Sequence, residues 1–102
     1  MATQLSATEH SRTDEEDDEQ GLLELLGDEY TRRVLAAVTE QPRCGNEVID
    51  AADVSKATAY RRLGELEEAG LVDSEMVFDP DGHHHERFHA VVESIDIELR
   101  AD

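Results

Sequence analysis

The stretch Val54–Val72, VSKATAYRRLGELEEAGLV, has the features of one helix that is capped at both ends. Ser55 suits the N-cap position because its hydroxyl can accept a hydrogen bond from a free backbone amide of the first turn. Gly70 stands where a left-handed C-terminal cap is expected, and this placement makes Leu66 and Leu71 the apolar pair that closes a Schellman motif. The stretch therefore predicts a bounded helix that is followed directly by an apolar strand.

This helix has two chemically different faces. Ala59, Leu63 and Leu66 follow the 3.6-residue period of a stripe that packs on a core. The residues on the opposite side are basic or polar: Lys56, Tyr60 and Arg61. One face is expected to pack on the domain, and the other is free to bind a partner.

The segment EVIDAADVS immediately upstream predicts a short helix and a three-residue turn. This order is that of a helix-turn-helix unit in which the second helix is the recognition helix. The pattern S-x-x-T-x-Y-R-x-L-x-x-L-x-x-x-G-L-V at Ser55–Val72 resembles the winged helix-turn-helix of ArsR-like transcriptional regulators, especially the small versions from halophilic archaea. A looser resemblance extends over Leu22–Leu99. Asp53 departs from the Gly that is common in such turns, but Asp tolerates the left-handed backbone region.

The length and composition predict one domain and a tail. Residues 1–20 carry seven acidic residues and one basic residue without an apolar period, so they are expected to form a disordered acidic tail before a domain at residues 21–102. Neither a long apolar run nor a basic and apolar leader occurs in the sequence. A cytoplasmic protein that does not span a membrane is therefore expected.

The formal net charge is −17, from 26 acidic and 9 basic residues. Such a charge by itself opposes a nucleic-acid partner, because phosphate binding depends on cationic side chains and released counterions. Lys56 is the only lysine, and this bias is interpreted as adaptation to a molar-salt cytoplasm. Charges in molar salt are screened beyond about 3 Å, so DNA binding there must depend on close contacts.

Two helices are expected before the helix-turn-helix unit. Leu22, Leu23, Leu25 and Leu26 indicate a short apolar helix that Gly27 stops, and these leucines either contribute to a dimer interface, as the resemblance implies, or pack on the domain. Gly27 or Asp28 can cap the next helix, which ends before Pro42. Its expected core stripe consists of Tyr30, Val34, Leu35 and Val38.

Cys44 stands where a Ser or Thr N-cap is usual, with Glu47 three residues later as in a capping box. A thiol at a helix N-terminus has an increased thiolate fraction, as a redox sensor requires. The alternative is a substituted cap residue, and the sequence offers no second cysteine to resolve an oxidised thiol. A single cysteine also excludes an internal disulfide and a multi-cysteine zinc site.

A β-hairpin is expected after the recognition helix. Val72, Met76 and Phe78 alternate along its first strand, and Asp79-Pro80-Asp81-Gly82 matches a type I turn. The return strand contains Phe88, Ala90 and Val92, and its only arginine is Arg87. The resemblance implies that this hairpin is a wing beside the DNA backbone or minor groove.

Four histidines, His83, His84, His85 and His89, gather near the tip of this hairpin. Such a group can bind zinc, nickel or copper through neutral imidazole. Adjacent strand residues point to opposite faces, however, so a solvent-facing tip or a phosphate neighbour is favoured. No metal and no cofactor are assigned.

Ile95, Ile97 and Leu99 alternate with charged residues, which is the period of a strand. Many ArsR-like proteins carry a dimerisation helix here instead. The pattern favours an extended wing strand, with a bulge near Glu93 and Ser94, and an open apolar edge that would invite a partner.

The sequence therefore predicts an α+β winged helix-turn-helix, with a helical core, a β-hairpin wing and an extended C-terminal strand. We expect a homodimeric, sequence-specific regulator of transcription that binds double-stranded DNA at high salt. No enzymatic pattern is present. The alternative is a protein-interaction module of the transcription machinery that does not bind DNA directly. The residues expected to contact DNA are Lys56, Thr58, Tyr60, Arg61 and Arg62 on the recognition helix and Arg87 on the wing.

Overall fold

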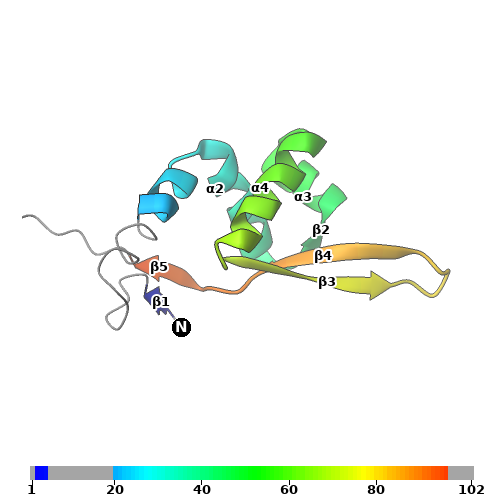
Figure 1. Ribbon diagram of the computed structural model, residues 1–102. Helices are drawn as coiled ribbons and strands as arrows, with labels where there is room; N and C mark the ends of the chain where they lie inside the picture. The colour runs from blue at the N-terminus through cyan, green and yellow to red at the C-terminus, as the bar shows by residue number, and fades with distance from the viewer. Residues whose placement is uncertain (1, 5–19, 97–102) are drawn as a thin grey trace, which may run out of the picture.

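The computed structural model describes residues 2–4 and 20–96. Helices lie on one side of a small antiparallel sheet, and the hairpin of this sheet projects well beyond them (Figure 1). The arrangement is the α+β winged helix-turn-helix fold that the sequence predicted.

The helices occur where they were expected. Residues 20–26 are helical, and α2 (Glu29–Glu40), α3 (Gly45–Ala52) and α4 (Lys56–Glu68) follow. Asp28 is the N-cap of α2, where its carboxylate accepts a hydrogen bond of 2.9 Å from the Thr31 amide. No described helix is long and apolar enough to cross a membrane.

The buried face of α2 differs from the predicted stripe. Val34 and Val38 are buried as expected, but Tyr30 is 48% exposed and Thr31 is fully buried. Thr31 can be buried because its hydroxyl donates to Asp28 Oδ2 at 3.1 Å, which satisfies its polar group. The Arg33 guanidinium lies 5.5 Å from the centroid of the Tyr30 ring, at the surface. The stripe therefore begins one residue later than predicted.

The turn and the caps around α4 follow the sequence closely. Asp53 adopts the left-handed conformation with φ 56° and ψ 56°. The Thr58 amide donates to Ser55 Oγ at 3.1 Å. At the other end Gly70 has φ +79°, and the Leu71 amide donates to the Leu66 carbonyl at 3.0 Å. This second bond is the 6→1 bond of the predicted Schellman motif.

The wing sheet has three strands in the order β2-β4-β3. β3 (Val72–Phe78) and β4 (His84–Ala90) form the predicted hairpin. β2 (Arg43–Cys44) pairs with β4 through Arg43↔Phe88 and Cys44↔Arg87. The sequence did not predict β2, because two residues are too few to show a strand period.

The hairpin turn has the predicted chemistry. The Gly82 amide donates to the Asp79 carbonyl at 3.0 Å, as in a type I turn. Gly82 then has φ +92°, and the Asp79 amide donates to the His83 carbonyl at 2.8 Å. A three-residue loop of this kind needs a residue that tolerates positive φ, and Gly does so without steric cost.

The C-terminal strand is present, but it does not extend the wing. β5 (Ser94–Asp96) pairs in parallel with β1 (Ala2–Gln4) in a separate two-stranded sheet. Residues 2–4 thus lie in a strand, within the range expected to be a tail. Residues 5–19 of that tail, and Ile97 and Leu99 of the predicted alternation, lie outside the described residues.

The core lies between the helices and the base of the wing. Its fully buried side chains come from α2, α3, α4 and Leu71, which directly precedes β3, and Val72 and Phe88 join them from the sheet. Leu22 is buried with them, whereas Leu23 is 47% exposed. The recognition helix contributes the residues that its period predicted: Ala59, Leu63 and Leu66.

Candidate nucleic-acid interface

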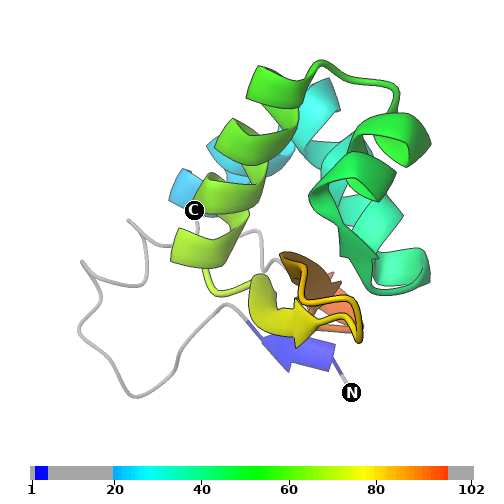
Figure 2. The ribbon, with the colours of Figure 1, turned by 90° about the vertical axis from the view of Figure 1, so that its right-hand side faces the viewer.

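The exposed face of α4 carries cations in its N-terminal half. Lys56 is exposed and makes no hydrogen bond or ion pair with any described residue. The Arg61 side chain is 72% exposed, and its contact with Glu65 is loose at 4.0 Å. Figure 2 shows α4 and α3 side by side, with the wing projecting beneath them. Two long cationic side chains are therefore free to reach a ligand in front of α4.

Thr58 lies in the first turn of α4, beside the N-cap. The Ser55 hydroxyl lies 3.0 Å from Thr58 Oγ1, and the Thr58 amide donates back to Ser55 Oγ. When Ser55 donates in the hydroxyl pair, the proton of the Thr58 hydroxyl remains available to an outside acceptor. A phosphate oxygen near a helix N-terminus is such an acceptor.

Tyr60 is less free than the sequence indicated. Its ring lies 6.5 Å from that of the buried Phe88, edge to face, and it covers Gly45 at the start of α3 so closely that a Cβ there would overlap the phenol. The side chain nevertheless remains 43% exposed. Tyr60 therefore links α4 to α3 and to the wing sheet. The helical period of the sequence did not predict these contacts of Tyr60 with α3 and the wing sheet.

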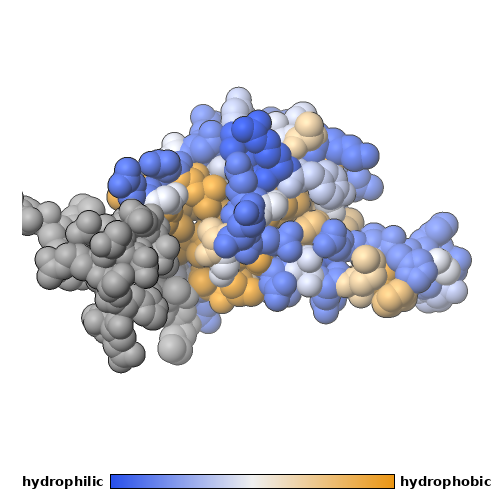
Figure 3. All heavy atoms as spheres, in the orientation of Figure 1, coloured by the Kyte–Doolittle hydropathy of each residue, from blue (hydrophilic) through white to orange (hydrophobic). Residues whose placement is uncertain are grey.

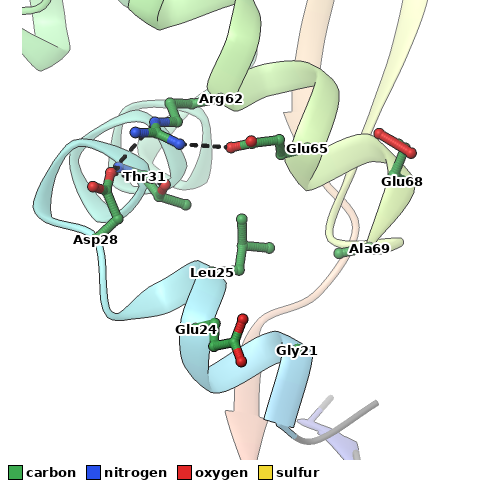
Figure 4. A pocket seen from close by; sticks show the side chains of 9 residues that line it. All are labelled: Gly21, Glu24, Leu25, Asp28, Thr31, Arg62, Glu65, Glu68 and Ala69. Carbon is green, nitrogen blue, oxygen red and sulfur yellow. Dashed lines mark hydrogen bonds and ion pairs between the residues drawn. The ribbon is translucent and has the colours of Figure 1, made fainter. Parts of the chain in front are cut away.

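Arg62 points away from the exposed face of α4. Its side chain is 19% exposed and lies against the N-terminus of α2, as Figure 4 shows. Its Nη1 donates to Glu65 at 2.9 Å, and its Nε lies 3.4 Å from the Asp28 carboxylate. The structure thus places Arg62 in an ion-pair cluster rather than beside Arg61.

This cluster borders an open pocket of about 460 Å³ between the helix at residues 20–26 and α4. The hydrogen bond from the Thr31 amide lowers the pKa of Asp28, and the nearby Arg62 adds to this effect. Conversely, the hydrogen bond to Glu65 raises the pKa of Arg62. Both groups therefore stay charged at neutral pH, and they connect the recognition helix to α2.

Arg87 lies on β4, and its Nη2 donates to Glu75 of the neighbouring strand at 2.7 Å. This hydrogen bond lowers the pKa of the Glu75 carboxyl. The Arg87 side chain is 46% exposed. The wing therefore offers no unpaired arginine or lysine among its described residues.

The histidines at the wing tip do not converge. His83 and His85 each contact a different aspartate, Asp81 at 3.1 Å and Asp79 at 3.6 Å. The His84 ring stands edge to face on Phe78 at 4.5 Å. Among the described residues no three histidine, cysteine or acidic side chains are arranged to hold a metal ion.

Cys44 is the N-cap of α3, as the sequence indicated. The Glu47 carboxylate accepts a hydrogen bond of 2.9 Å from the Cys44 amide, which lowers the pKa of Glu47. The capping box is therefore present. Cys44 also belongs to β2, so it joins α3 to the wing sheet.

Residues 26–75 match the profile of a helix-turn-helix domain family. One solved structure to which the chain is similar is that of a PadR-like transcription factor from bacteroid fragilis. It is 16% identical, with a TM-score of 0.48 over 81% of this chain and 78% of that chain. No curated protein matches the sequence. These matches do not separate the ArsR-like regulators, which the sequence resembles, from other winged helix-turn-helix proteins. The profile match agrees with the observed geometry, in which α3, the turn at Asp53 and α4 form a helix-turn-helix unit within residues 26–75.

Proposed function

We propose that this protein is a DNA-binding regulator of transcription that places α4 in the major groove. The observation that carries this proposal is the division of α4 into a buried face and an exposed cationic face, with caps at both ends. A rigid, capped helix with free Lys56 and Arg61 side chains is the element that a helix-turn-helix protein inserts between the two DNA backbones.

The exposed residues of α4 have different roles in this proposal. Arg61 can donate two hydrogen bonds to a guanine, and Lys56 and the Thr58 hydroxyl can contact phosphates. Tyr60 retains an exposed edge that can touch DNA while its ring packs on Phe88. Arg62 acts through its ion pairs, by fixing α4 on α2.

In this proposal the wing plays a smaller part in DNA binding than α4. Arg87 is tied to Glu75, and the wing residues 72–90 contain five acidic residues, namely Asp73, Glu75, Asp79, Asp81 and Glu86. A phosphate contact by Arg87 would share its guanidinium with the Glu75 carboxylate, which weakens the attraction to the phosphate. The main contribution to affinity therefore comes from α4.

The finer features follow from the composition and from the resemblance. The acidic surface suits a molar-salt cytoplasm, where close contacts rather than long-range attraction decide binding. An ArsR-like regulator of this size acts as a homodimer on a two-fold operator. The exposed Leu23 of the first helix is one apolar surface that a second subunit could cover.

Selection from a random duplex library in molar potassium chloride tests the function. We expect enrichment of one sequence with two half-sites about one helical turn apart. Light scattering of the protein without DNA should give the molar mass of a dimer. A folded protein that enriches no sequence at any salt concentration would contradict the proposal and favour the protein-interaction alternative. A monomer that still selects one half-site would contradict only the dimer.

A further inference from the structure

The outer edge of β3 is open along the projecting part of the wing. β3 is the edge strand in the order β2-β4-β3, and Figure 1 shows its outer half extending past the helices. Edge strands of this length expose backbone donors and acceptors to which another strand can pair.

The register identifies which backbone groups point outward. The Asp79 amide donates to the His83 carbonyl, and the Val91 amide donates to the Leu71 carbonyl, so these pairs lie in hydrogen-bonded positions of the ladder. Hydrogen-bonded and non-hydrogen-bonded pairs alternate along antiparallel strands. Ser74, Met76 and Phe78 therefore direct their N–H and C=O groups away from β4. The Ser74 amide already donates to the Asp73 carboxylate, which leaves the groups of Met76 and Phe78 open.

The two faces of this open edge have different chemistry. Met76 and Phe78 are 53% and 66% exposed and lie on the face that, at the base of the wing, packs on the core through Val72. Figure 3 shows this apolar patch on the projecting wing. The opposite face of β3 carries Val77 and two carboxylates, that of Asp73 and that of Glu75, and the second is paired with Arg87 of β4. An added strand would meet apolar side chains on one face and acidic side chains on the other.

We propose that β3 binds an extended segment of another protein, with alternating apolar and basic residues, as a fourth strand of the wing sheet. Main-chain hydrogen bonds to Met76 and Phe78 would hold this strand, as in other cases of strand addition. Its apolar side chains cover Met76 and Phe78, while its Lys or Arg side chains face Asp73 and the outer side of Glu75, which Arg87 contacts from β4.

The charges distinguish this partner from two other occupants. A second copy of β3 would bring its own Asp73 carboxylate, beside a Glu75 that is already paired with Arg87, onto the acidic face, and like charges on neighbouring strands are destabilising. A DNA backbone would meet Glu86, which is paired with Met76 across the hairpin, with no free arginine or lysine among the described wing residues to offset it. A basic strand has neither problem.

Calorimetric titration of the full chain tests this proposal, and it does not depend on the DNA-binding function. The probe is an octapeptide of alternating lysine and valine, used in about 1 M potassium chloride so that non-specific attraction is screened. We expect one saturable site. A peptide with serine in place of valine, and one with N-methylated amides along one edge, should each bind at least roughly tenfold more weakly.

The matched protein variants locate the site. Met76→Ser with Phe78→Ser should weaken binding of the alternating peptide by roughly tenfold, whereas Leu23→Ser, another exposed apolar residue, should not change it. Circular dichroism should confirm that both variants are folded.

Absence of binding, equal binding of the three peptides, or an unaffected double variant would overturn the proposal. So would a double variant that lost duplex DNA affinity but kept the peptide. Arg61→Ala should leave peptide binding unchanged, which separates this proposal from the function of α4.

Discussion

The phenol of Tyr60 occupies the space into which a side chain at Gly45 would project. Tyr60 comes from the recognition helix and Gly45 is the first residue of α3, so the absence of one Cβ permits the close approach of these two helices. Phe88 supports the ring from the wing sheet. The three elements that define a winged helix-turn-helix thus meet at a single aromatic side chain.

Gly45→Ala should destabilise the fold by about 1–3 kcal/mol, because the new methyl group overpacks against the Tyr60 ring. Urea unfolding measures this change. In a Tyr60→Ser background the same substitution should be neutral or stabilising, since the overlap is gone and Ala favours a helix over Gly. Gly64→Ala is the control, because nothing lies near that position, and it should stabilise by about 0.5–1 kcal/mol. A Gly45→Ala protein as stable as the wild type would contradict the packing described.

Arg61→Ala should weaken binding to the selected duplex by about 1–3 kcal/mol and relax preference at one base pair, because a bidentate contact to guanine is lost. Lys56→Ala should weaken all duplexes similarly and lower the salt slope by about 1, as expected for a phosphate contact. Fluorescence anisotropy with matched and single-substituted duplexes measures both. Unchanged affinity and base preference in Arg61→Ala would remove α4 from the proposed interface.

Arg62→Ala should act on stability and not on base preference. The substitution leaves the Asp28 and Glu65 carboxylates without their common partner, so the thermal midpoint of unfolding should fall. Below that midpoint, the order of preference among duplexes should match the wild type. A variant of normal stability that altered preference at a base pair would instead support the direct DNA contact expected from the sequence.

Stability should decline in acid, partly through Asp28. The Thr31 amide holds the pKa of Asp28 below its usual range, so the ionised carboxylate stabilises the folded state. This contribution is present above the unfolded-state pKa of about 4 and is lost as pH falls through the lower folded-state pKa. Asp28→Asn should therefore be less stable than the wild type at pH 7, with a smaller difference near pH 2. An equal difference at both pH values would mean that the charge is not the cause. Glu47 and Glu75, with pKa values also lowered, should give both proteins a common residual acid sensitivity.

Cys44→Ser should retain folding stability and DNA affinity, with a gain of up to about 1 kcal/mol, because Ser is the better N-cap and Glu47 still accepts the hydrogen bond from residue 44. Peroxide treatment followed by a DNA-binding measurement provides the test. If the wild type loses DNA affinity on oxidation and Cys44→Ser does not, Cys44 is a redox sensor as well as the N-cap of α3.

Local chemistry in the sequence was sufficient for the elements with strong signals at both ends. Ser55 marks the start of α4 and Gly70 marks its end. Both the Ser55 cap and the Schellman bond from Leu71 occur as predicted. Asp79 and Gly82 likewise determine the hairpin turn. Each of these features depends on residues within about six positions of one another in the sequence. Local backbone geometry therefore brings these residues together without help from distant segments.

The fold class, the buried face of α4 and the wing hairpin were thus determined by the sequence alone, through capping chemistry and hydrophobic period. Only the tertiary structure decided the direction of Arg62, the packing of Tyr60 on Gly45, the pairing of β2 with β4 and the pairing of β5 with β1. Each of these depends on which distant segment comes to lie beside a residue. A helical period gives the angle at which a side chain leaves its helix, but the partner that it meets there depends on the packing of the whole chain.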